Sequence, residues 1–100
     1  MTSYVYLLSY NPMMPALSPA QIHAFIEQHR DIRTWYIPFS GTYVIKSELA
    51  LVTLVEPFRR FFGPNLFILT YVNRSLIGGS LPNQVWDWIN EVENNLLSSK

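Results

Sequence analysis

The order of the predicted secondary-structure elements constrains the fold of this chain more than any other feature. Apolar periodicity predicts a strand, a helix, two strands, a second helix and a fourth strand within residues 4–72. The first strand, Tyr4–Tyr10, carries apolar or aromatic side chains on both of its sides, which is typical of a central strand covered on both faces. This order predicts one small α+β sandwich, and 100 residues suffice for a single domain.

The first helix has a clear start signal. Ser18 and Gln21 have the spacing of a capping box. Pro19 stands at the first helical position, where a backbone N–H would have no partner within the helix, so proline loses nothing there. We expect this helix to end near Arg30. The chain has two histidines in this region, His23 and His29. They lie six residues apart, a spacing that does not fit a pair of metal ligands on one helical face. We expect His23 to be solvated.

The second helix contains an anomaly. Ser47 is a candidate N-terminal cap for it, and Gly63 marks its end. Pro57 lies between them, and proline inside a helix removes one backbone hydrogen bond. We therefore expect a bend or break near Glu56.

The two middle strands should form a hairpin. Arg33–Phe39 and Thr42–Lys46 are rich in β-forming residues, and Ser40-Gly41 separates them. Pro38 cannot donate to a neighbouring strand, which favours an edge position for the first of the two strands. Simple alternation places three apolar side chains on one face of that strand: Trp35, Ile37 and Phe39. The fourth strand is expected over Leu66–Val72.

The C-terminal part, residues 73–96, should form a loop and a third helix that starts near Pro82. On this helix Trp88 shares an apolar stripe with Val85 and Ile89, so we assign it to the core. Trp86 points about 200° away from Trp88, so it is left for another surface. Residues 97–100 are expected to fray.

The composition favours a subunit interface. Hydrophobic residues make up 49% of the chain and aromatic residues 15%, whereas charged residues make up only 14%, against about 25% in typical globular domains. A domain of this size cannot hide so much apolar surface, and an exposed apolar patch usually marks an interface. We expect the sheet face without helices to be lined by aromatic residues. A two-fold homodimer should form through this face or through an edge strand, extended by the segment after Val72. The interface candidates are Tyr4, Tyr6, Tyr10 and Trp86.

Charge and cysteine content exclude several classes. Seven basic and seven acidic residues leave no net charge, so the basic stripe of a strong polyanion binder is absent. The chain has no cysteine, which excludes disulfides and thiolate metal sites. No apolar run reaches the ~18 residues of a membrane span, and the N-terminus lacks the pattern of a signal peptide. We expect a cytoplasmic protein without a cofactor.

Short hydrophobic motifs between residues 4 and 90 resemble those of a known family. The matching segments are Val5–Asn11, Trp35-Tyr36, Gly41–Ile45, Pro57-Phe58, Leu66–Leu69, Leu81-Pro82 and Trp86–Ile89. In these segments the chain resembles the short bacterial proteins of the SinR family, which are similar to the small ferredoxin-like subunit of the CRISPR spacer-acquisition complex. The resemblance implies a ferredoxin-like βαββαβ sandwich with an additional C-terminal helix, a homodimer and a connection to nucleic acid.

The resemblance also identifies a departure at Asn11. Family members with metal-dependent nuclease activity carry an aspartate at the end of the first strand, where two such carboxylates in a dimer can hold a divalent cation. An amide supplies a neutral oxygen and lacks the charge that Mg²⁺ prefers. The sequence therefore argues against an enzyme and predicts no metal site, and Asn11-Pro12 is also an ordinary end for a strand.

Basic residues are few, and two interpretations remain open for them. If they converge they can contact phosphates, each adding to a salt-dependent affinity. Otherwise they form a solvated face or pair with Glu56 and Asp31. The candidate phosphate contacts are Arg33, Arg59, Arg60 and Arg74, with Arg30 nearby.

Three functions from different classes are consistent with the sequence. The first is a non-catalytic homodimeric interaction or scaffolding module that contacts duplex nucleic acid through shape and backbone. The second is a metal-dependent endonuclease that uses an acid other than position 11. The third is a small-ligand regulatory domain with a pocket beside Trp86 and Trp88.

Overall fold

The computed structural model describes residues 3–90, and its elements follow the predicted order. All four strands belong to one antiparallel sheet with the strand order β2-β3-β1-β4, so β1 is central and β2 and β4 are the edges. The predicted α+β class is confirmed, and the arrangement is compatible with a ferredoxin-like βαββαβ sandwich followed by a C-terminal helix. The elements are β1 (Tyr4–Tyr10), α1 (Pro19–Gln28), β2 (Thr34–Phe39), β3 (Thr42–Ser47), α2 (Leu51–Phe62), β4 (Phe67–Tyr71), the 3₁₀-helix η1 (Arg74–Leu76) and α3 (Asn83–Asn90).

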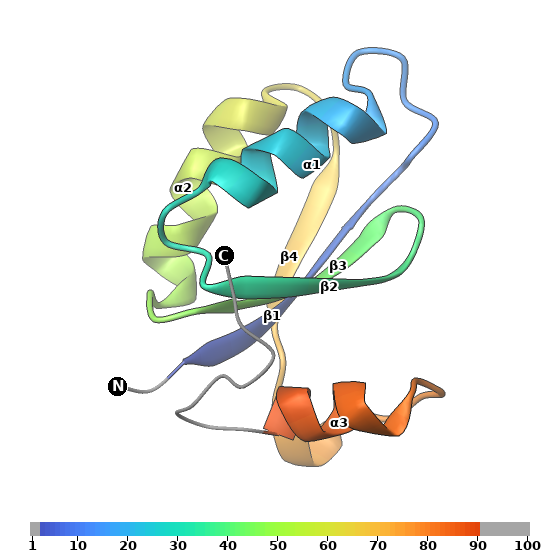
Figure 1. Ribbon diagram of the computed structural model, residues 1–100. Helices are drawn as coiled ribbons and strands as arrows, with labels where there is room; N and C mark the ends of the chain where they lie inside the picture. Colours follow the sequence, from blue (N-terminus) through green and yellow to red (C-terminus); the bar gives the residue numbers. More distant parts are fainter. Residues whose placement is uncertain (1–2, 91–100) are drawn as a thin grey trace.

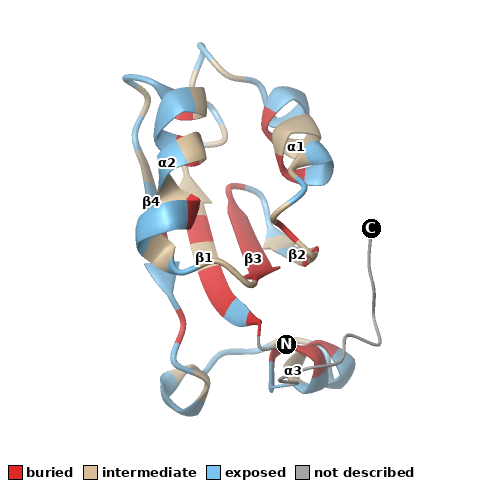
Figure 2. Cartoon of the chain, turned by 90° about the vertical axis from the view of Figure 1, so that its left-hand side faces the viewer, coloured by how far each residue is buried: buried red, intermediate tan, exposed pale blue. Residues whose placement is uncertain are grey.

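Helices cover both faces of the sheet. Figure 1 shows α1 and α2 on one side and α3 on the other, and in Figure 2 the buried residues are concentrated on β1 and β3 between these layers. The main core lies under α1 and α2 and is built from one side of each inner strand. Its fully buried members include Tyr6, Leu8, Ile22, Ile26, Ile45, Leu54 and Phe58.

A second, smaller core lies under α3. It contains Val5 of β1 and Trp88 of α3, and Trp88 is only 2% exposed, as its place in the apolar stripe predicted. The cluster also contains Val44, Val72, Val85 and Ile89. The predicted continuation of the third helix to residue 96 and the expected fraying of residues 97–100 lie outside the described residues. Among the helices of the described part, none is long and apolar enough to cross a membrane.

The predicted start of α1 is confirmed. The hydroxyl of Ser18 accepts from the N–H of Gln21 at 3.2 Å, and the Gln21 side chain accepts from the N–H of Ser18 at 2.8 Å. These two bonds satisfy donors that the first turn of a helix leaves open. The helix ends at Gln28, with His29 as its C-cap.

The start of α2 differs from the prediction, because Ser47 is not its cap. Ser47 is the last residue of β3, pairs with Tyr4 of β1, and accepts the N–H of Leu49 at 3.1 Å. Pairing within the sheet extends β3 by this one residue, so the cap moves to Ala50, which makes no side-chain hydrogen bond. Of the bend or break expected near Glu56, the break is wrong, since α2 runs unbroken through Pro57, and the bend stays a prediction.

The hairpin and the edge position of β2 are confirmed, but the expected alternation along β2 is wrong. The pairing shifts by one residue between Tyr36 and Phe39, which marks a bulge around Pro38. Trp35 therefore lies on the face covered by α1 and α2, whereas Phe39, paired with Thr42, lies on the opposite face.

Candidate functional site

The end of β1 places Asn11 in a turn rather than in a cluster of acids. Its side-chain oxygen accepts the N–H of Met13 at 2.9 Å, and its main-chain oxygen accepts the N–H of Met14 at 3.2 Å. This arrangement is an Asx turn, which ends the strand before Pro12. Within residues 3–90, no group of three or more histidines, aspartates or glutamates is placed to hold a metal ion.

Three of the four candidate phosphate contacts have other partners. Arg33 donates to Glu48 on the loop that follows β3. Arg59 pairs with Glu56 one turn earlier on α2 at 2.7 Å, as the alternative interpretation of the sequence proposed.

Arg74 supports α3. It donates to the main-chain oxygen of Ile89 at 2.7 Å and to that of Ser3 at 2.8 Å. It therefore ties the end of α3 to the start of β1. Arg60, exposed on the last turn of α2, is the remaining candidate, and its guanidinium makes no ion pair or hydrogen bond with another residue in the described range.

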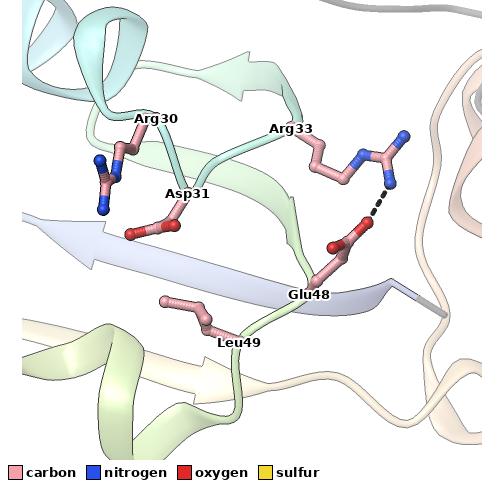
Figure 3. Close-up of a pocket in the computed structure, with 5 residues that line it drawn as sticks. All are labelled: Arg30, Asp31, Arg33, Glu48 and Leu49. Atoms are coloured by element: carbon pink, nitrogen blue, oxygen red, sulfur yellow. Dashed lines mark hydrogen bonds and ion pairs between the residues drawn. The ribbon is translucent and has the colours of Figure 1, made fainter. Parts of the chain in front are cut away.

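A cleft of about 220 Å³ lies where the α1–β2 and β3–α2 loops meet. Figure 3 shows the Arg33–Glu48 pair at one side of this cleft and Arg30 beside Asp31 at the other. Two cations and two anions cancel here, so the cleft does not offer the net positive charge that a phosphate site requires. Sequence reasoning singled out Arg33 but not its partner Glu48, since a cap at Ser47 would have put position 48 in the first turn of α2.

A second cleft, of about 380 Å³, lies between the start of α1 and the β2–β3 turn. Burial, with smaller effects of Tyr10 and Glu27, raises the pKa of Tyr43 to about 12. Its hydroxyl stays protonated at neutral pH and shares a hydrogen bond of 2.9 Å with Nδ1 of His23. His23, expected to be solvated, has a side chain that is 42% exposed and that also links α1 to β3. Nothing in the spacing of the two residues could have revealed this contact.

The tyrosines proposed for an interface lie on the side of the sheet covered by α1 and α2. Tyr6 is 1% exposed and donates to the main-chain oxygen of Leu49 at 2.7 Å, so its ring offers no surface to a partner. Tyr10 is half-buried against the main core, and Tyr4 remains exposed. Trp86 is half-buried against the smaller core. The sheet face opposite α1 and α2 is therefore not lined by the tyrosines of β1.

Within residues 3–90 the outer edge of β4 is open. In this range β4 pairs with β1 on one side and with no strand on the other, and no charged residue occurs between positions 61 and 73. Ile68 is 65% exposed on the part of the face that α3 does not cover, and Leu66, just before the strand, is 87% exposed. An open, uncharged edge with apolar side chains is a template for pairing with another chain. The sequence signal was present in Leu66–Val72, but nothing in it showed which strand lies at the edge.

Comparisons with protein-family models, with curated proteins and with solved structures find no significant match for this chain. The functional argument therefore depends on the contacts described above.

Proposed function

We propose that this chain is a non-catalytic interaction module that acts as a homodimer, similar in role to the small ferredoxin-like subunit of the CRISPR spacer-acquisition complex. The observation that carries the proposal is the open edge of β4, which has no charge and exposes Ile68 and Leu66 beside it. Natural proteins usually protect such an edge with lysine, proline or a covering segment. An edge left unprotected, next to exposed apolar residues, supports an interface.

In this proposal the last turn of α2 contacts duplex nucleic acid. Arg59 and Arg60 are both exposed there, and Arg60 has no competing partner among the described residues. Two copies in a dimer would present this turn twice. Because so few phosphates would be neutralised, binding should be weak and should fall only moderately with added salt. Mobility-shift titrations of duplex DNA and RNA with the wild type and with Arg60→Ala measure this contribution.

Sedimentation equilibrium tests the assembly. At micromolar concentration we expect a species of twice the 11.6 kDa chain mass. Burial of the exposed apolar residues at the β4 edge supplies the driving force. A single species of 11.6 kDa over the whole range would contradict the proposal.

A nuclease assay distinguishes this proposal from the endonuclease alternative. We expect no Mg²⁺-dependent cleavage of DNA or RNA, because the oxygen of Asn11 is neutral and already accepts a hydrogen bond in the turn. Asn11→Ala serves as the matched control, since it removes the same oxygen without adding a charge. Cleavage that survives Asn11→Ala but is lost in a variant such as Glu48→Gln would show that another acid carries out catalysis.

A further inference from the structure

We propose that β4 pairs with β4 of a second copy of this chain, antiparallel and with Leu69 on the two-fold axis, so that two four-stranded sheets become one continuous sheet. This inference rests on the homodimer proposed above and specifies its geometry. The occupant of the open edge is thus the same strand of another copy.

The direction of the backbone groups follows from the pairing of β4 with β1. Just after β4, the N–H of Val72 donates to the main-chain oxygen of Val5 at 2.8 Å, so Val72 points its polar backbone groups at β1. In an antiparallel strand successive residues point these groups to alternate edges. Thr70 and Ile68 therefore also bond towards β1. The residues whose N–H and C=O groups face the open edge are Phe67, Leu69 and Tyr71.

One register uses all of these outward-facing groups. With Leu69 on the axis, Leu69 meets its own counterpart, and Phe67 meets Tyr71 of the partner subunit. A register centred on Ile68 would place Tyr71 opposite a residue before the strand, and one centred on Thr70 would place Phe67 opposite a residue after it. Because buried backbone groups need partners, the register centred on Leu69 is the most favourable one.

The side chains fit the same arrangement. Ile68 would lie opposite Thr70 of the partner subunit on the uncovered part of the sheet face, and neither carries a charge. A charge near a two-fold axis would meet its own copy and repel it, and β4 has none. The other edge of the sheet is less suitable, because β2 contains Pro38 and a bulge.

The area requirement brings in residues beside the strand. A stable interface buries about 800 Å² on each partner, and a five-residue strand edge alone supplies less. Leu66 would lie opposite Val72 of the partner subunit, next to the start of the partner's η1. Leu76 within η1 is 81% exposed, so both ends of the paired strands add apolar surface.

The absence of cysteine from the chain allows a test of the register by crosslinking. In the proposed dimer positions 68 and 70 of opposite copies form a non-hydrogen-bonded pair with Cα atoms about 4.5 Å apart, within the range for a disulfide. The double variant Ile68→Cys/Thr70→Cys should therefore form a covalent dimer on mild oxidation. Either single variant should not, because like positions are roughly 8 Å apart across the axis. Phe39→Cys, exposed at the β2 edge, is the matched control and should stay unlinked.

Each outcome decides between specific alternatives. Crosslinking of Ile68→Cys alone or of Thr70→Cys alone would place a different residue on the axis and overturn the register. A wild type that is dimeric by sedimentation while the double variant stays unlinked would overturn pairing through β4 and leave the homodimer standing. A monomeric wild type would overturn both.

A second variant keeps the inference testable if the double variant does not fold. Ile68→Lys places a charge beside the axis on an exposed position, so the dimer should dissociate at least about tenfold more readily. Phe39→Lys, its control at the other edge, should leave the dissociation constant unchanged. If both variants are folded by circular dichroism and the two substitutions change the dissociation constant equally, β4 is not the strand that forms the interface.

Discussion

Truncation of Trp88 to alanine is expected to lower the free energy of unfolding by about 3–5 kcal/mol, a large part of the stability of a small domain. Trp88 is 2% exposed and lies at the centre of the smaller core, between α3 and residues such as Val5 and Val44 of the sheet. Its removal leaves a cavity that neighbouring side chains cannot fill. Urea unfolding followed by far-ultraviolet circular dichroism measures the loss.

Two control variants test whether the loss comes from the burial and the ring volume of Trp88. Trp86→Ala removes an equal volume from the same helix, but Trp86 is half-buried, so we expect a clearly smaller loss. Trp88→Phe keeps most of the ring volume, and among residues 3–90 the Nε1 of Trp88 has no hydrogen-bond partner to lose. It should therefore be much milder than Trp88→Ala. A melt in which Trp86→Ala is the more damaging variant would show that the two tryptophans were assigned to the wrong surfaces.

Features encoded by a few neighbouring residues could be predicted from the sequence. Two such features are the capping box of Ser18 and Gln21 and the hairpin turn at Gly41, each of which is signalled by residues a few positions apart. At Gly41 the turn requires φ +88°, which is a local condition. A Cβ atom would also lie 2.8 Å from the main-chain oxygen of Tyr10, a long-range contact that the local sequence does not show. Only glycine meets both conditions easily.

Features that depend on pairing partners could not be predicted. Ser47 has the composition of a helix cap, but pairing with Tyr4 extends β3 and displaces the helix start. Phe39 fits an alternating strand, and only the register against Thr42 shows that a bulge reverses its side. Both cases show tertiary pairing overriding a local pattern.

The candidate site shows the same limit more strongly. A hydrogen bond joins the side chain of Arg74 to the backbone of Ser3, 71 residues away in the sequence. Another joins the side chain of Lys46 to the backbone of Trp88, 42 residues away. No spacing rule connects such residues. The neutral character of Asn11, by contrast, can be read directly from the sequence, whereas the expectation of a carboxylate at this position came from the resemblance alone.

The second large effect is expected at Lys46, which is 1% exposed beneath α3. Its ammonium donates to the main-chain oxygen of Trp88 and lies 5.0 Å from the centroid of the Trp88 ring. A cation near the C-terminal end of a helix also interacts favourably with the helix dipole. Lys46→Ala removes this donor together with a buried four-carbon stem, so we expect a loss of about 2–4 kcal/mol in unfolding free energy.

Lys46→Met separates the stem from the ammonium, because methionine fills a similar volume but cannot donate. If the hydrogen bond to Trp88 stabilises α3 on the sheet, Lys46→Met should recover only part of what Lys46→Ala loses. Burying an ammonium also costs desolvation free energy, which methionine avoids. Wild-type stability in Lys46→Met would therefore mean that the contacts of the ammonium, the bond to Trp88 among them, only offset that cost and that packing of the stem holds the helix. Urea unfolding of the two variants and the wild type at one pH decides between these outcomes.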